Sequence, residues 1–337
     1  MNLQKIEFSE YIDVGTWESL VKELNHPNFL YCPIDQIQDT FRFIEQNPKE
    51  NYVVVSGCSD YGLEYQDENP INNDLRKVIN FVRFDEIEQI RDRYVHLRVP
   101  SANYEQCSLS DRFSVKIYAY TGHTFDKTPT NLKRWYCTNS NIDSGEFQGR
   151  VKWIPFGVNN DGPGSSYIPG VWGLPKKNLL YVNFQGTTME RVRLKDIFSY
   201  LDRQNTAETS WNIETNEWLG QLIYRDSPNI PVKTYLEELS GSKFVISPRG
   251  NGHDCYRHLE CIYAGSIPIL EKSRLTEQFI RVGLPVMVCN GYEGIKPSDL
   301  ERVWDELQSY EFNYDTVRLS FWREKFKEEL TNLDCGL

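Results

Sequence analysis

Short apolar runs alternate along the chain with segments whose apolar residues recur at helical spacing. In the first half, apolar runs predict strands at residues 29–34, 52–56, 94–99, 114–120 and 151–158. Ile37, Phe41 and Ile44 predict a helix over residues 35–46, and a further helix is expected at residues 85–92. This alternation is typical of an α/β fold with a mostly parallel sheet.

The same alternation restarts after a segment rich in glycine and proline. Residues 159–178 contain seven Gly or Pro among twenty positions, which predicts a flexible linker. Beyond it, strands are expected at residues 179–184, 243–247, 267–270 and 285–289, and helices at residues 189–204, 232–239, 255–264, 275–280, 297–307 and 315–330. The chain is therefore expected to form two Rossmann-like domains, residues 1–165 and 175–310, that face each other across a cleft, followed by a final helix within residues 311–337.

Composition and charge narrow the range of possible functions. Hydrophobic residues make up 39% and charged residues 25% of the 337 positions, as in ordinary globular proteins. Thirty-seven Lys and Arg against forty-eight Asp and Glu leave a net charge of −11, which repels a phosphate backbone and argues against nucleic-acid binding. An anionic small molecule stays allowed if the cations that contact it are concentrated in one place.

Cysteine usage and hydropathy bear on the compartment. The eight cysteines are scattered without a C-x-x-C pair, which is typical of neither a zinc site nor a small disulfide framework. Reduced thiols in the cytoplasm are the simplest interpretation. No apolar run approaches the roughly 18 residues of a membrane-spanning helix, and the N-terminal residues do not resemble a signal peptide. We therefore expect a cytoplasmic protein without a transmembrane segment.

One stretch, residues 243–270, combines a strand, a glycine-containing loop and a helix. Gly250 and Gly252 would let backbone N–H groups approach an anion closely, and the N-terminus of the following helix, which we expect Asp254 to cap, adds partial positive charge. Cys255 stands at the third glycine position of G-x-G-x-x-G, so this is not a standard dinucleotide fingerprint, and the spacing does not fit a Walker P-loop either.

Charged side chains in the same stretch suit a nucleotide. Arg249 and Arg257 can grip phosphate oxygens, and Glu260, three residues after Arg257, lies on the same helix face, where it can accept hydrogen bonds from a ribose diol. The alternative is that Arg257 and Glu260 form a surface ion pair and the glycines serve only the turn.

The pattern KF.ISP.GNG.D.YR..E....G.IPI resembles the donor-binding domain of exostosin-like (GT47-type) glycosyltransferases and, more distantly, inverting fucosyltransferases. The resemblance is concentrated in residues 179–270. It implies a GT-B fold in which the second domain binds a nucleotide-sugar, with UDP expected, the first domain binds the acceptor, and the final helix packs back on the first domain. Carried over to this chain, Arg257 faces the diphosphate, Glu260 faces the ribose, and the rest of the donor loop consists of Ser247, Arg249, Gly250, Asn251, Gly252, His253, Asp254 and Tyr256.

A second candidate for the donor site follows the strand at residues 179–184. Thr187 and Thr188 offer hydroxyl groups, and Arg191 stands at the start of the next helix, where related transferases place an arginine that contacts phosphate. The alternative is that Arg191 is a solvated helix residue.

The acceptor side needs a base that deprotonates the attacking hydroxyl. Asp60, directly after the strand at residues 52–56, is the first candidate, with Glu64 as a substitute and His123 as a group that could bind acceptor or phosphate. Asp60 could equally be a plain turn residue. The chain has no D-x-D flanked by apolar residues, so we expect catalysis without a metal ion and without a cofactor, the nucleotide-sugar being a co-substrate.

These observations favour an inverting glycosyltransferase that moves a sugar from a nucleotide-sugar to a hydroxyl of a glycan acceptor. The lack of an expected membrane anchor favours a bacterial or viral enzyme that makes surface or capsid glycans from cytosolic precursors. One alternative is a catalytically inactive protein of the same fold that binds a nucleotide-sugar or a carbohydrate. Another, an NAD-linked oxidoreductase, is disfavoured by the incomplete glycine fingerprint.

Overall fold

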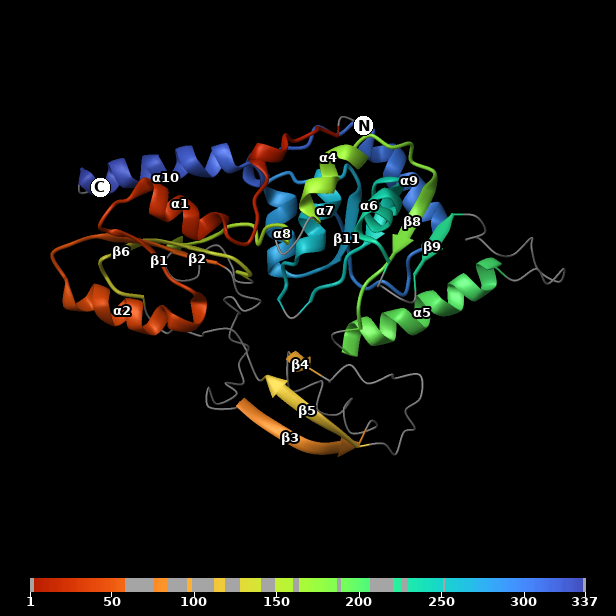
Figure 1. Ribbon diagram of the computed structural model, residues 1–337, viewed down its shortest axis with the longest axis horizontal. Helices are drawn as coiled ribbons and strands as arrows, with labels where there is room; N and C mark the ends of the chain where they lie inside the picture. The colour runs from red at the N-terminus through yellow and green to blue at the C-terminus, as the bar shows by residue number, and fades with distance from the viewer. Residues whose placement is uncertain are drawn as a thin grey trace.

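The computed structural model describes residues 3–57, 76–83, 96–98, 112–118, 128–140, 149–159, 164–186, 189–206, 221–225, 230–250 and 252–335. These residues form a mixed α/β fold with two parallel sheets and one antiparallel sheet (Figure 1). The α/β fold expected from the alternation of strands and helices is therefore confirmed. Among the helices described, none has the length and apolar character needed to cross a bilayer.

The first half is built on a parallel sheet with the order β1-β2-β6-β7. Its strands are β1 (Phe29–Tyr31), β2 (Tyr52–Ser56), β6 (Leu132–Cys137) and β7 (Val151–Trp153). Successive strand residues point to opposite faces. Val53 therefore packs with Trp17 of α1 (Thr16–Leu24), and Val54 packs with Phe41 of α2 (Ile37–Gln46). The uninterrupted apolar run of β2 therefore places apolar side chains on both faces of the sheet, and one helix covers each face (Figure 1).

The second half is built on a five-stranded parallel sheet with the order β12-β11-β10-β8-β9. The strands are β8 (Asn178–Val182), β9 (Leu222–Tyr224), β10 (Ser242–Ile246), β11 (Ile267–Glu271) and β12 (Met287–Cys289). The helices are α5 (Met189–Thr206), α6 (Val232–Ser240), α7 (Tyr256–Tyr263), α8 (Arg274–Arg281) and α9 (Pro297–Leu307). Leucines and other apolar residues of α6, α7 and α8 share one core cluster, whereas those of α5 and α9 pack in another, so both faces of the sheet are covered.

A separate antiparallel sheet, with the order β3-β5-β4, corrects the expected topology of the first half. Its strands are β3 (Arg76–Arg83), β4 (His96–Arg98) and β5 (Arg112–Tyr118). The strands expected at residues 94–99 and 114–120 exist, but they pair with each other and with β3 and not with the parallel sheet (Figure 1). The helix expected at residues 85–92 lies outside the described residues.

The segment predicted as a flexible linker is packed over its described second part. Residues 164–178 contain the short helices η5 (Ser165–Tyr167) and α4 (Ile168–Val171), and Ile168 and Val171 are buried in the core. The hydroxyl of Ser240 in α6 donates to the carbonyl oxygen of Val171 at 2.6 Å. The prediction of a flexible linker is therefore wrong for residues 164–178, because two apolar side chains anchor them on the second half.

The two halves share one continuous hydrophobic core. The last helix, α10 (Leu319–Asp334), follows the second half in the chain but packs on the first, where Phe326 contacts the rings of Phe29 and Tyr136. At the other end of this core, the ring of Tyr11 stacks on Tyr263 of α7 with 4.1 Å between centroids. A segment of the first half thus packs on α7, and the helix that follows the second half packs on the first. These contacts fix the position of the loops of one half relative to those of the other.

Candidate functional site

The strand order of the second sheet locates a candidate site. From β8 the chain runs through α5 to β9 on one side, whereas from β10 it runs through α7 to β11 on the other. In open α/β sheets, ligands bind beyond the carboxyl ends of the strands at the point where the connections diverge in this way. The segments after β8 and β10 therefore delimit the candidate site.

Arg191, near the start of α5, binds the loop after β10 through its backbone carbonyl oxygens. The Nε of Arg191 donates to the carbonyl oxygen of Arg249 at 2.8 Å, and its Nη2 donates to that of Pro248 at 2.9 Å. A Cβ atom on Gly250 would lie 3.4 Å from the same Nη2, an ordinary van der Waals contact, so the loop lies directly against the guanidinium. Arg191 is 8% exposed, which shows that it is not the solvated helix residue that one interpretation allowed.

Asp254 ties this loop to the first half of the molecule. Its Oδ2 accepts the backbone N–H of Phe156, just beyond β7, at 2.9 Å, and its own N–H donates to Oδ1 of Asn139, just beyond β6, at 2.6 Å. The expectation that Asp254 caps the following helix is wrong. The N-cap residue of α7 is Cys255, and the carboxylate of Asp254 is occupied by Phe156 and by His258 instead.

His258 continues these contacts toward the sheet. Its Nδ1 lies 3.1 Å from Oδ1 of Asp254, and its Nε2 lies 3.3 Å from the carbonyl oxygen of Ser247 at the end of β10. Burial lowers the pKa of the imidazole, but Cys255 and Asp254 outweigh this and raise the pKa of His258 to about 10. Burial raises the pKa of the Cys255 thiol, but His258 and two nearby arginines bring that pKa down to about 7.

The opposite side of the first turn of α7 carries Arg257 and Glu260. The hydroxyl of Tyr235 in α6 donates to Oε2 of Glu260 at 2.7 Å, and the guanidinium carbon of Arg257 lies 5.9 Å from the centre of the Tyr235 ring. Both charged side chains are half-buried, so the two charges, which attract each other, are not the exposed surface pair that one interpretation allowed. Burial raises the pKa of the Glu260 carboxyl.

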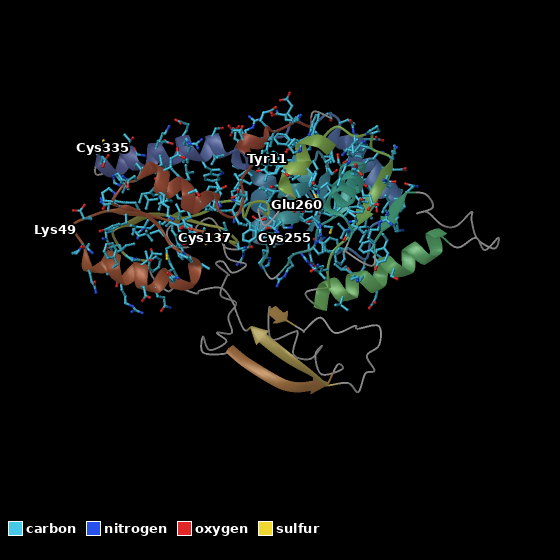
Figure 2. The ribbon with its side chains drawn as sticks, in the orientation of Figure 1. Tyr11, Lys49, Cys137, Cys255, Glu260 and Cys335 are labelled. Carbon is cyan, nitrogen blue, oxygen red and sulfur yellow. The ribbon has the colours of Figure 1, made fainter. Side chains whose placement is uncertain are left out.

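One atom of Arg257 stands out. Its Nε is buried and has no hydrogen-bond partner among the described residues. Burial of a guanidinium N–H without a hydrogen-bond partner destabilises the protein. An acceptor oxygen of a ligand would supply the missing partner. Figure 2 labels Cys255, the N-cap residue of α7, and Glu260 within that helix, which mark this region.

A pocket of about 170 Å³ lies between the loop after β10 and the first turn of α8. Within it, Nη1 of Arg249 lies 3.2 Å from Nε2 of His253, and Oγ of Ser247 is a buried hydroxyl that has no partner in the described part of the chain. The lining is polar and carries both signs of charge; it consists of Ser247, Arg249, His253, His258, Leu270, Glu271, Lys272, Ser273 and Thr276.

Part of this lining was not singled out from the sequence. His258, Glu271, Lys272 and Thr276 are not among the residues that the sequence pattern indicated. The available signal was position, because Glu271 and Lys272 lie at the carboxyl end of a predicted strand, where α/β folds place their ligands.

The other sequence-based candidates divide into two groups. Tyr256 lies in the first turn of α7, with its ring 5.0 Å from that of Phe156, and Gly252 is buried beside Asp254. The remaining candidates lie outside the described residues; they are Asp60, Glu64, His123, Thr187, Thr188 and Asn251.

Comparison with known protein families points to the same region. Residues 173–281 match the family model described as the RXYLT1 C-terminal domain, and this match supports the resemblance to exostosin-like glycosyltransferases of the GT47 type. The matched segment includes β8, β10, β11, α7 and α8, and therefore the whole described candidate site. No curated protein matches the chain significantly.

Proposed function

We propose that this chain is an inverting, GT-B-type glycosyltransferase that moves a sugar from a UDP-sugar to a hydroxyl group of a glycan acceptor. The family-model match supports glycosyl transfer of the GT47 type, and the diverging connections at β8 and β10 supply the place where a nucleotide would bind. The observation that carries the proposal is the buried Nε of Arg257 at the first turn of α7, which has no hydrogen-bond partner within the described ranges.

A nucleoside diphosphate would complement this turn. Its oxygens would accept from Arg257, while the N-terminus of α7 adds partial positive charge. The interaction of these groups with the diphosphate would be strongest in the transition state. There the bond between the sugar and the diphosphate breaks, and negative charge builds on the leaving oxygen. Arg257 would therefore assist departure of the nucleotide as well as its binding.

The neighbouring groups suit the two ends of the donor. Glu260, oriented by Tyr235, would accept hydrogen bonds from the ribose diol. The sugar would occupy the pocket beside α8. Neighbouring strands lie only about 5 Å apart, so a diphosphate held at the first turn of α7 is long enough to cross the end of β10 and place the sugar there. A volume of about 170 Å³ is below the roughly 300–1,000 Å³ of pockets for drug-sized ligands, so it suits one sugar ring better than a whole nucleotide.

The acceptor hydroxyl would attack the anomeric carbon from the first half while a base takes its proton. Asp60 is our first candidate for this base, with Glu64 and His123 as the others. We further propose that no metal ion takes part and that the reaction uses cytosolic nucleotide-sugars. The charge that a metal would otherwise supply comes from Arg257 and Arg249.

Nucleotide release from a panel of UDP-sugars and glycan acceptors tests the proposal. We expect Arg257→Ala to lower turnover by at least about a hundredfold, as removal of one donor to a developing oxyanion does elsewhere. Arg302→Ala is the matched control, since Arg302 lies in a surface pair with Glu306 in α9 and its loss should leave turnover unchanged. Near-normal turnover in Arg257→Ala would contradict the assignment of Arg257. UDP binding without release for any acceptor would instead identify a nucleotide-sugar-binding protein.

A further inference from the structure

A row of buried hydrogen bonds runs from the first half of the molecule to the end of β10. It begins at Asn139, passes through Asp254 and His258, and ends at the carbonyl oxygen of Ser247. All four residues are 2% exposed or less. The row therefore joins the two halves without solvent in between.

We propose that Asn139 is a positioning residue for the donor loop, acting through Asp254 and His258. The inference rests on the proposed nucleotide-sugar site, because positioning has meaning only if this loop binds the donor. Asn139 contacts the donor loop at the N–H of Asp254, and through Asp254 it acts on the residues that shape the loop. We call the set Asn139, Asp254, His258 and Ser247 the positioning row.

The backbone at Asn139 is specialised for this task. Its φ is 54°, in the left-handed region, which asparagine tolerates better than most residues. The adjacent residues anchor the turn on two sides: the N–H of Thr138 donates to the carbonyl oxygen of Ser56, and Nε2 of Gln278 in α8 donates to that of Ser140 at 3.1 Å. A turn held in this way presents Oδ1 of Asn139 to the loop in a fixed direction.

Each later step depends on the one before it. The N–H of Asp254 is buried, so losing Oδ1 of Asn139 leaves it without that acceptor and favours a shift of Asp254. The carboxylate of Asp254 then no longer faces Nδ1 of His258, and the imidazole loses the partner that sets its orientation. His258 holds the carbonyl oxygen of Ser247, where the donor loop begins.

Two variants of one kind test the inference. Asn139→Gly removes the acceptor oxygen but permits the left-handed backbone, since glycine adopts it freely. Asn25→Gly is the matched control, because Asn25 also has a left-handed φ, 45°, but lies at the C-cap of α1, away from the loop. Both changes carry the same cost in backbone freedom, so a difference between them reports the loss of the buried Asn139 side chain, including its acceptor Oδ1.

The first measurement is UDP affinity of the full chain by calorimetry. We expect Asn139→Gly to bind UDP about tenfold more weakly than the wild type, the scale of one lost buried hydrogen bond, and Asn25→Gly to bind it as the wild type does. Equal affinities of the two variants would overturn the inference. Absence of UDP binding by the wild type would instead overturn the proposed function.

The second measurement, NMR titration of His258, does not depend on a ligand. The groups around this imidazole include Asp254, Cys255 and Glu260, with Arg191 and Arg257 acting on the Cys255 thiol, and the ring of Phe279 from α8 at 6.0 Å. The pocket that His258 lines also carries Arg249, His253, Glu271 and Lys272. We expect His258 to hold its proton about tenfold less tightly in Asn139→Gly and unchanged in Asn25→Gly. An unchanged titration in Asn139→Gly would overturn the row, whatever UDP does.

Asp254→Asn provides the second route if Asn139→Gly does not fold. It keeps the shape of Asp254 but removes the charge that faces His258, so it should weaken both the UDP affinity and the proton affinity of His258. Where both single variants fold, the double variant should bind UDP no more weakly than Asp254→Asn alone, because the two residues act in series. Additive losses would show that they act independently, and would contradict the inference.

Discussion

The two sides of the first turn of α7 differ in how completely their polar groups are paired. On one side, Asp254 and His258 have protein partners for the carboxylate oxygens and for both ring nitrogens. On the other, the buried Nε of Arg257 has no partner among the described residues. A satisfied buried network rigidifies its surroundings, whereas a buried polar atom without a partner costs free energy that an acceptor from a ligand can recover. The side with Asp254 and His258 is thus suited to hold the donor loop in place, and the side with Arg257 is suited to bind a ligand.

Breaking the satisfied side should have the largest effect on stability. Asp254→Ala leaves the buried imidazolium of His258 without its carboxylate, so we expect the free energy of unfolding to fall by about 3–5 kcal/mol. Urea denaturation measures it. Asp305→Ala, at an exposed position of α9, is the control and should change stability by less than about 0.5 kcal/mol. A small effect of Asp254→Ala would mean that water replaces the carboxylate at little cost.

Raising the pH should weaken the same side more gradually. The folded pKa of His258 is raised to about 10 from an ordinary value of 6.5, so its contribution is complete below pH 6.5 and is lost as the pH rises toward 10. Cys255 acts in the opposite sense, because its pKa is lowered to about 7 and its thiolate stabilises the fold as the pH rises from 7 to 9. Cys255→Ser removes the thiolate that raises the pKa of His258 most, so in this background the shift rests on Asp254, and the unfolding free energy should decline over a narrower pH range above 6.5. A rise over this range would contradict the charge of His258.

A smaller effect should come from the binding side. Tyr235→Phe removes the hydroxyl that donates to Glu260, and since that bond lowers the pKa of a carboxyl already raised by burial, the pKa should rise further. We expect about tenfold weaker UDP binding, with the loss growing as the pH falls and the carboxyl becomes protonated. Calorimetry between pH 5.5 and 8 measures this, with the exposed Tyr310→Phe as control. A loss independent of pH would show that Glu260 does not contact the nucleotide.

The smallest expected effect is that of a chelator. If Arg257 and Arg249 stabilise the leaving diphosphate in place of a metal ion, EDTA should leave the rate of UDP release unchanged, and added Mg²⁺ or Mn²⁺ should not raise it. A rate that falls with EDTA and returns with Mn²⁺ would show that the binding side is completed by a cation and not by arginines alone.

Local patterns predicted much of the fold. β2 has the bounds expected from its apolar run, and α9 begins at Pro297 and ends at Leu307 as its spacing indicates. α1 was missed, although Trp17, Leu20 and Val21 recur at helical spacing. The antiparallel sheet could not be told from the parallel one, because strand periodicity carries no information on the partner.

The site was predictable only in part, because its decisive contacts join residues far apart in sequence. The glycines and arginines of the donor loop were visible as a local pattern. The contact between Asp254 and Asn139, which are 115 positions apart, and the use of Arg191 to hold loop carbonyls were not. Gly and Pro content likewise suggested a linker where Ile168 and Val171 are in fact buried, since it does not report on burial.

Tyr263, at the last position of α7, has a consequence for the order of folding. Its hydroxyl accepts the N–H of Ile12 at 3.1 Å and donates to the carbonyl oxygen of Val317 at 2.8 Å. The helix that bears Arg257 is therefore anchored by segments more than 250 and by 54 positions away in sequence. Contacts of such separation close late, because closing a long loop costs entropy before the contact can stabilise it. During synthesis, α7 reaches its final anchorage only after residue 317 has left the ribosome, so a shorter nascent chain lacks the completed site.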